Sequence, residues 1–207
     1  MSDPNYYNSL YGLPEPADTV AEDAALSGLK GGLDQTFPKR IRIRRDLISY
    51  IPPAQATNII YKNVSLIKTI PASEHERITR YIKGVFTGRY EREKLISYLM
   101  RIGDVTEARA TLIADDQIAK ASEQFKVAKW LARGVTRVRW VHSGAEEPRD
   151  YHLRRWNRSS GTRNGKPNGL NGFEFDLWNP PVIDLKTGER GFPGQLVNCH
   201  CHLEIVR

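Results

Sequence analysis

Apolar side chains recur at helical spacing in the middle of the chain. The first such stretch predicts a helix from Ser73 to about Gly88, with one apolar face made of Ile78, Tyr81, Ile82, Val85 and Phe86. Ser73 and Glu76 have the spacing of a capping box, in which a hydroxyl and a carboxylate bond the first free backbone amides. The pattern therefore places the start of this helix at Ser73 and its end at Gly88.

Two further helices are predicted after it. One runs from about Glu91 to Arg101 and is closed by Gly103. The next is long, from near Thr106 to about Arg133. Its small and apolar residues repeat at close to seven positions, which suits packing against a neighbouring helix or another subunit.

Beyond Gly134 the pattern changes to β-branched and aromatic residues separated by turn residues, which predicts short strands. The expected elements are a strand at 136–142, a helix or turn at 151–156, a basic loop at 154–170, and strands at 173–177 and 197–206. We therefore expect an α+β fold. An N-terminal extended arm leads to a helical segment with three main helices, one of them long, and a small antiparallel β-rich C-terminal domain follows.

The part of the chain before these helices is divided by charge. Residues 1–36 hold six acids and one lysine with little periodicity, which is typical of a tail or arm. Residues 37–69 hold seven basic residues and one acid, and the alternation from Ile41 to Arg44 predicts an edge strand or extended arm. A short helix is expected from Ala56 to Ile67. The predicted divisions are an arm at 1–70, a helical region at 71–133 and a C-terminal domain at 134–207.

The net charge favours an acidic partner. Lys and Arg number 31 against 24 for Asp and Glu, a net charge of +7 at pH 7, and DNA is a polyanion that such a chain would attract. The residues expected to contact nucleic acid or a protein partner lie in the arm and the basic loop: Arg42, Arg44, Arg45, Arg154, Arg155, Arg158, Arg163 and Lys166. The alternatives are a charged strand edge that resists aggregation and a plain solvated loop. No apolar run has the length of a membrane span, and no signal peptide opens the chain, so we expect synthesis in a cytoplasm and no membrane partner.

The last third of the chain holds both cysteines and four of the five histidines. Cys199 and Cys201 are one residue apart, so on an extended segment both thiols point to the same face, where they could bind zinc together with His152, His142 or His202. The alternative is a metal-free pair of half-buried thiols with histidines that only form hydrogen bonds. A disulfide between the two cysteines would close a strained ring.

The C-terminal motifs occur in a characteristic order. They are the helix end at 131–135, the strand at 138–144, Arg149-x-x-His152, the turn and strand at 171–175, Asn179-Pro180-Pro181, and Pro193-Gly194 followed by Cys199-x-Cys201. In this order and spacing the stretch 117–201 resembles the phage Mu F-like head morphogenesis domain, found in minor head proteins of tailed bacteriophages. The family usually has Asp-Gly where this chain has Asn171-Gly172. Some relatives carry Cys-x-x-Cys where this chain has Arg149-x-x-His152, which implies a metal role for His152 and one sulfur ligand fewer.

The resemblance implies a structural virion component rather than an enzyme. Such a protein is made in the host cytoplasm and acts in the phage head, in several copies, by docking to the portal protein, the major capsid protein or both, with packaged DNA within reach. It implies a closed structural site for zinc at His152, Cys199, Cys201 and His142. Two other interpretations stay open: a metal-dependent nuclease-type enzyme, for which Glu146, Glu147 and Asp150 are the dense acidic group nearby, and a basic DNA-binding module.

Overall fold

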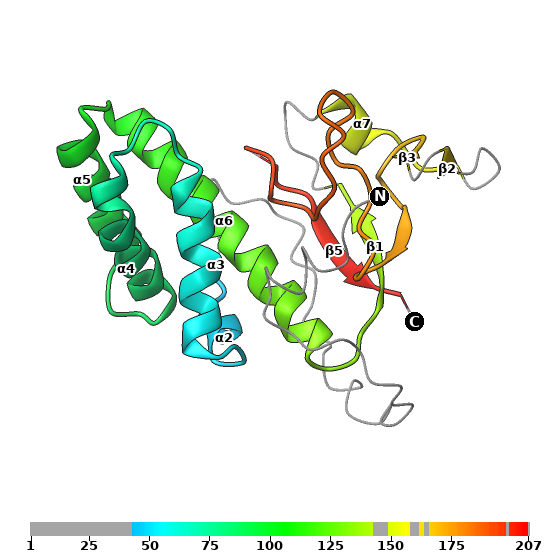
Figure 1. Cartoon of the computed structure of the whole chain (residues 1–207), viewed down its shortest axis with the longest axis horizontal. Helices are drawn as coiled ribbons and strands as arrows, with labels where there is room; N and C mark the ends of the chain where they lie inside the picture. The colour runs from blue at the N-terminus through cyan, green and yellow to red at the C-terminus, as the bar shows by residue number, and fades with distance from the viewer. Residues whose placement is uncertain (1–42, 143–148, 158–161, 164–165, 198, 207) are drawn as a thin grey trace.

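Helices make up the first half of the described chain and a small antiparallel sheet lies in the second, so the predicted α+β class is confirmed (Figure 1). The computed structural model describes residues 43–142, 149–157, 162–163, 166–197 and 199–206. The helices are α2 (Arg45–Ile48), α3 (Pro53–Ser65), the 3-10 turn η2 (Ala72–Glu74), α4 (His75–Phe86), α5 (Arg92–Gly103), α6 (Glu107–Leu131) and α7 (Asp150–Leu153). The strands are β1 (Arg137–Val141), β2 (Thr162–Arg163), β3 (Lys166–Pro167), β4 (Glu174–Asp176) and β5 (His202–Ile205).

The apolar faces read from the sequence meet in one core. The fully buried side chains of α3, α4 and α5 pack against α6, and the ring of Phe86 lies edge-on to Phe125 with 5.0 Å between centroids. Burying such aromatic and aliphatic side chains contributes roughly 1.5–3 kcal/mol each. The helix expected at 56–67 is present as α3, and the two helices expected after Gly88 are present as α5 and α6.

The helix ends differ from the predicted ones at two places. Ser73 does not cap α4, because the backbone N–H of Glu74 bonds the carbonyl of Pro71 at 2.9 Å and a 3-10 turn precedes the helix. The capping box is therefore wrong. Helix α5 continues through Gly103, and the left-handed residue that ends it is Asp104, with φ 45°. Gly88, with φ +74°, follows the end of α4 as expected.

The sheet has the strand order β4-β1-β5, with both neighbours antiparallel to β1. Val138 pairs with Phe175 on one side and Ile205 on the other, while Trp140 pairs with Leu203. The strands expected at 136–142 and 173–177 are present in shorter form. The strand expected at 197–206 is wrong in its first half, because β5 begins at His202 and both cysteines precede it in irregular backbone.

Helix α6 lies between the other helices and the sheet (Figure 1). The ammonium group of Lys126 donates to the carbonyl of Leu203 in β5 at 3.4 Å, and buried residues of both halves belong to one continuous cluster. Nearly every side of α6 is covered toward its C-terminal end, where Val127, Ala128 and Lys129 are all buried. The long helix is thus shared by both halves of the molecule.

The acidic segment 1–36 and Arg42 lie outside the described residues. Ile43 and Arg44, the described end of the expected edge strand, belong to no strand and lead directly into α2. None of the described helices combines the length and the apolar character needed to cross a membrane.

Candidate metal centre

Three buried side chains from distant parts of the chain meet beside the sheet. His152 is 2% exposed, Cys199 6% and Cys201 5%. The Nδ1 atom of His152 lies 3.5 Å from the sulfur of Cys199 and 3.9 Å from that of Cys201, and the three ligand atoms all lie within 4.8 Å of one another. The structure therefore brings together three of the four residues that the sequence suggested as metal ligands.

Helix α7 holds His152 in a fixed orientation. The hydroxyl of Tyr151 donates to the carbonyl of Val182 at 3.1 Å, and Nε2 of His152 lies 3.0 Å from the carbonyl of the next residue, Ile183. Because a carbonyl oxygen only accepts, Nε2 carries the proton and the lone pair of Nδ1 faces the two sulfurs. A histidine that donates its second ring nitrogen to a backbone carbonyl is the usual arrangement around a bound metal ion.

The two cysteines are positioned by the turn before them. Gly194 has φ +80°, a conformation natural for glycine, and a β-carbon there would lie 3.5 Å from the side chain of Glu123 and 3.7 Å from the carbonyl oxygen of Ala119, both in α6. The backbone N–H of Gly194 bonds the sulfur of Cys199, and the N–H of Cys199 bonds the carbonyl of Leu196 at 3.1 Å. The thiols therefore converge through a turn anchored on α6, and the extended segment expected at this point is absent.

The surroundings favour a thiolate at Cys199. A hydrogen bond from Cys201 lowers the pKa of the Cys199 thiol, and the bond from the Gly194 N–H lowers it further, although burial opposes them. Burial alone raises the pKa of the neighbouring Tyr151 to about 12, so that this phenol stays neutral. The thiolate is the form of cysteine that binds metals.

The donor set and its spacing fit a metal ion such as zinc. Tetrahedral zinc holds nitrogen at about 2.0–2.1 Å and sulfur at about 2.3 Å, which puts neighbouring nitrogen and sulfur ligands about 3.6 Å apart. The two nitrogen–sulfur distances of 3.5 and 3.9 Å lie on either side of that value. The indole of Trp140, which is fully buried, lies edge-on to His152 at 5.2 Å and forms an apolar wall.

The other histidines of this region stay outside the cluster. His142, the fourth expected ligand, is half-buried at the end of β1 and is not among the ligand atoms that meet. Burial lowers its pKa, while the charge of Cys199 raises it, so the two residues are electrostatically coupled. His202 lies 3.8 Å from Glu204, and His200 is exposed. Among the described residues, three side chains thus meet in a group that could hold a metal ion.

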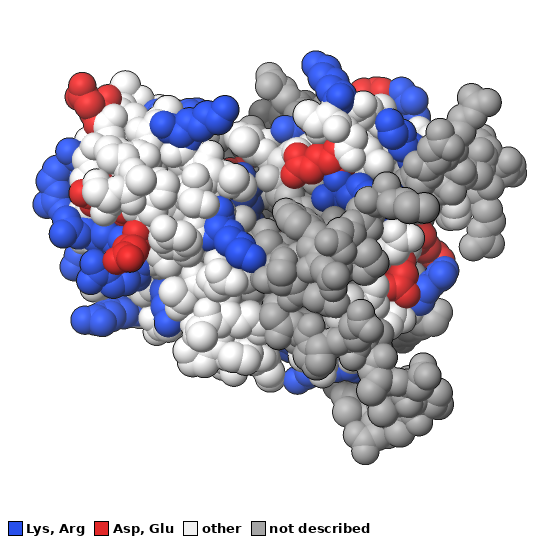
Figure 2. All heavy atoms as spheres, in the orientation of Figure 1, with Lys and Arg blue, Asp and Glu red and all other residues white. Residues whose placement is uncertain are grey.

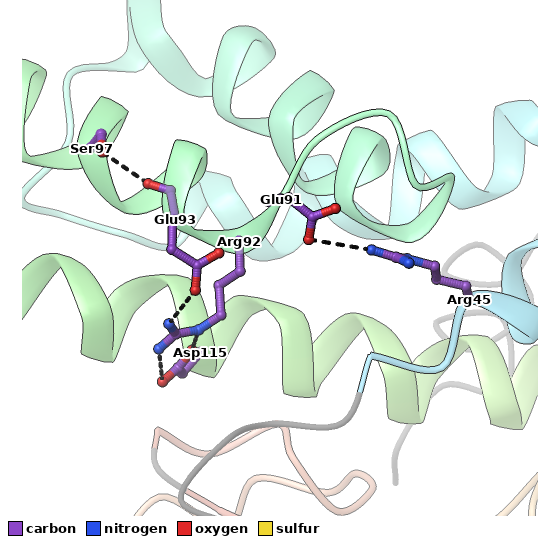
Figure 3. Close-up of polar contacts among 6 residues, drawn as sticks. All are labelled: Arg45, Glu91, Arg92, Glu93, Ser97 and Asp115. Carbon is purple, nitrogen blue, oxygen red and sulfur yellow. Dashed lines mark hydrogen bonds and ion pairs between the residues drawn. The ribbon is translucent and has the colours of Figure 1, made fainter.

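The carboxylates that a catalytic interpretation would use are bound elsewhere. Asp115 pairs with the guanidinium of Arg92 on α5, and Figure 3 shows Glu93 on the same guanidinium. Asp116 pairs with Lys120 one turn further along α6. Asp150 pairs with Arg154, and Glu146 and Glu147 lie outside the described residues. A cleft of about 180 Å³ lies between the end of α3 and α6; Val197, two residues before Cys199, lines it, but none of the three ligands does.

The residues expected to contact nucleic acid are scattered in the structure. Arg44 pairs with Asp46, and Arg45 with Glu91 at 3.6 Å, as Figure 3 shows. Arg154 is paired as described above. Arg155 and Lys166 are exposed and have no ion pair with any residue the structure describes. Arg42, Arg158 and the side chain of Arg163 lie outside the described part.

Sequence reasoning missed two backbone groups of the centre, the carbonyl of Ile183 and the N–H of Gly194. The sequence analysis noted Pro193-Gly194 as one of the ordered motifs but assigned no role to it, and it did not single out Ile183. Comparison of the chain with family models, with curated proteins and with solved structures gives no significant match. The resemblance to the Mu F-like domain therefore rests on the quoted motifs alone.

Proposed function

We propose that this protein is a minor head protein of a tailed bacteriophage, similar to the Mu F-like family. It acts in capsid assembly by docking to the portal protein, the major capsid protein or both. The observation that carries the proposal is the buried group of His152, Cys199 and Cys201, which lies at the end of the ordered motifs that suggest the family. A buried cluster of this kind would make the C-terminal half rigid. A rigid domain suits a protein that binds its partners through its surface.

The bound metal in this proposal is zinc. His152, Cys199 and Cys201 hold the ion, which supplies a cross-link between α7 and the segment before β5. Because ligands must be ordered to bind, the binding energy of the metal contributes directly to folding of the C-terminal half. These three side chains would leave one position of a tetrahedral zinc ion for a water molecule or a further residue.

A structural role is favoured over a catalytic one by burial and by charge. The three ligands are at most 6% exposed, so a substrate would have to displace the wall around them. A nuclease needs carboxylates that converge on its metal, and Asp115, Asp116 and Asp150 pair with cations instead, while no described carboxylate joins the three ligands. Zinc held by three protein ligands is also the arrangement of catalytic sites, which makes an enzyme the alternative to be tested.

The test measures metal and partner binding in the same preparations. We expect about one zinc per chain by elemental analysis, and co-sedimentation with the portal or major capsid protein of the same genome. The variant C199S/C201S should lose the zinc, whereas the control H200A, which changes the exposed histidine between the two cysteines, should keep it.

The outcomes separate the two parts of the proposal. Zinc without association to either capsid component would refute the virion role and leave the metal centre standing. Association without zinc would refute the metal centre alone. Cleavage of DNA by the zinc-loaded protein, lost in C199S/C201S, would replace the structural role by the enzymatic one.

A further inference from the structure

Three tyrosines form a continuous stack on the outer side of the helical half. Tyr81 of α4 lies 4.6 Å from Tyr98 of α5, centroid to centroid, and 5.1 Å from Tyr90. Gly84 makes room for this stack, because a β-carbon there would lie 2.2 Å from the ring of Tyr90. A glycine inside a helix costs about 0.5–1 kcal/mol relative to alanine, so this close approach accounts for its presence.

Cations lie over the rings at both ends of the stack. The guanidinium carbons of Arg77 and Arg101 lie 6.0 and 5.2 Å from the centroid of Tyr98. Over Tyr90 lie Arg89 at 5.5 Å and the ammonium of Lys94 at 4.8 Å. Cation–π contacts of this kind hold a flexible side chain in place while its N–H groups stay free to bond another molecule. We call these four cations and the three tyrosines the tyrosine–arginine surface.

The acids of this region have partners of their own or lie exposed nearby. Glu91 pairs with Arg45 of α2, and Glu93 with Arg92, whose guanidinium also binds Asp115 of α6 (Figure 3). The side chains of Glu91 and Glu93 remain 74% and 72% exposed. Glu74 binds the hydroxyl of Tyr98 and lies 3.8 Å from Arg77, and Glu76 is exposed at the margin.

Three of the four cations are left without an acidic partner. Arg89, Lys94 and Arg101 are exposed and have no ion pair with a residue in the described ranges. Figure 2 shows Lys and Arg side chains gathered at the edge of the molecule where α4 and α5 lie. Asp and Glu atoms also lie at this edge, so basic side chains predominate there without excluding acidic ones.

We propose that the tyrosine–arginine surface binds the phosphate backbone of double-stranded nucleic acid, without reading its sequence. Exposed cations held on α4, on α5 and in the turn between them suit a rigid polyanion with regularly spaced charges. The rings themselves are not available for stacking with bases, since Tyr98 is only 3% exposed and the others are half-buried. The contact is therefore electrostatic, and it requires neither the metal centre nor the virion role.

The size of the effect follows from counterion release. Each neutralised phosphate contributes about −0.9 to the slope of log affinity against log salt concentration, so four cations give a slope of about −3.6. The affinity for a duplex should then fall about 100-fold between 50 and 200 mM salt. Removing three of the four cations should reduce the slope by about 2.7.

The experiment compares two triple variants of the full chain that have the same net charge. R89Q/K94Q/R101Q removes three cations of the tyrosine–arginine surface, and the control R155Q/K166Q/K186Q removes three exposed cations of the C-terminal half that also lack ion pairs with described residues. Fluorescence anisotropy with a labelled 20-base-pair duplex of arbitrary sequence gives the affinity at several salt concentrations. Far-UV circular dichroism and the melting temperature verify that both variants are folded.

At 100 mM salt we expect the first variant to lose at least about tenfold in affinity and the control to stay within about twofold. Equal losses in both variants would overturn the proposal, because binding would then follow net charge alone. Loss in the control alone would overturn it in favour of the basic loop. It also fails if the wild-type protein does not bind the duplex at 50 mM salt, or if it binds polyglutamate in preference to the duplex.

Discussion

The helical half and the C-terminal half are stabilised in different ways. In α3 to α6 the apolar side chains repeat along each helix, and the buried residues include Ile59, Ile82, Leu95 and Phe125. The C-terminal half has only short strands, and its long irregular stretch between β4 and β5 is held by contacts that converge on His152. Many equivalent contacts stabilise the first half, whereas a few long-range ones stabilise the second. The two halves should therefore respond differently to single substitutions.

The largest effect is expected at the metal centre. His152→Ala removes a ligand and the hydrogen bond to Ile183, so the C-terminal half should lose its ordered packing while the helices persist. We expect a loss of more than about 4 kcal/mol in the stability of this half. Tryptophan fluorescence measures it, because Trp140, Trp156 and Trp178 lie there. His202→Ala, which changes a half-buried histidine outside the cluster, should change little. If both variants and the wild type had the same melting temperature, the cluster of His152, Cys199 and Cys201 would not be what stabilises this half.

The helical half should tolerate the loss of any one contact better, though still at a cost. Phe125→Ala leaves a cavity beside Phe86 and should lower the free energy of unfolding by about 3–5 kcal/mol. Urea titration followed by far-UV circular dichroism measures this. Leu66→Ala is the control, because Leu66 is 74% exposed and its loss should cost less than about 0.5 kcal/mol. Similar costs for the two variants would contradict the position of the core.

A smaller effect is expected at the Gly194 turn, which lies against α6. Gly194→Ala forces an alanine to φ +80°, which should cost about 1–2 kcal/mol. A β-carbon would meet only ordinary contacts there, the nearest at 3.5 Å from Glu123, so the cost arises from the backbone. Gly103→Ala, at the last residue of α5, should be neutral or slightly stabilising. Thermal melts of both variants measure the difference, and a harmless Gly194→Ala would exclude the left-handed turn.

The smallest effect is expected at the start of α6. Thr106 accepts a hydrogen bond from the N–H of Arg109 at 3.3 Å, so Thr106→Ala should cost about 1 kcal/mol. Ser97→Ala removes an exposed hydroxyl that only bonds the carbonyl of Glu93 within α5, and we expect no loss from it. Chemical denaturation measures both. Equal stability of the two variants would show that the cap contributes nothing.

The sequence predicted the helical half well because its information is local. The spacing of Ile78, Ile82 and Val85 identifies the buried face of α4 without any knowledge of the partner helix. The capping box failed because Ser73 lies inside the 3-10 turn Ala72–Glu74, so that α4 begins only at His75 and Glu74, not Ser73, takes the N-cap position. A side-chain cap and a 3-10 turn are alternative ways to begin a helix, and the local sequence does not decide between them.

The metal centre could be predicted in part. Residue type and spacing indicated Cys199 and Cys201 with His152, His142 or His202 as further candidates, and the family resemblance singled out His152. The orientation of His152 could not be predicted, because it depends on the carbonyl of Ile183, which belongs to an irregular segment without any pattern. The absence of His142 from the cluster could not be predicted either. His142 follows β1, whose position depends on pairing with β5, far along the chain.

The position of β1 in the middle of its sheet has a consequence for biosynthesis. Val138 pairs with Ile205, and the cysteines that meet His152 immediately precede β5. At about 5–20 residues per second, the ribosome needs several seconds to make the chain between these partners. During that time the helical half can fold on the nascent chain, while the edge of β1 stays open to any neighbouring strand. The edge of β1 is covered only when β5 docks. Slow translation or crowding of ribosomes on one messenger RNA would therefore favour incorrect strand pairing in the C-terminal half alone.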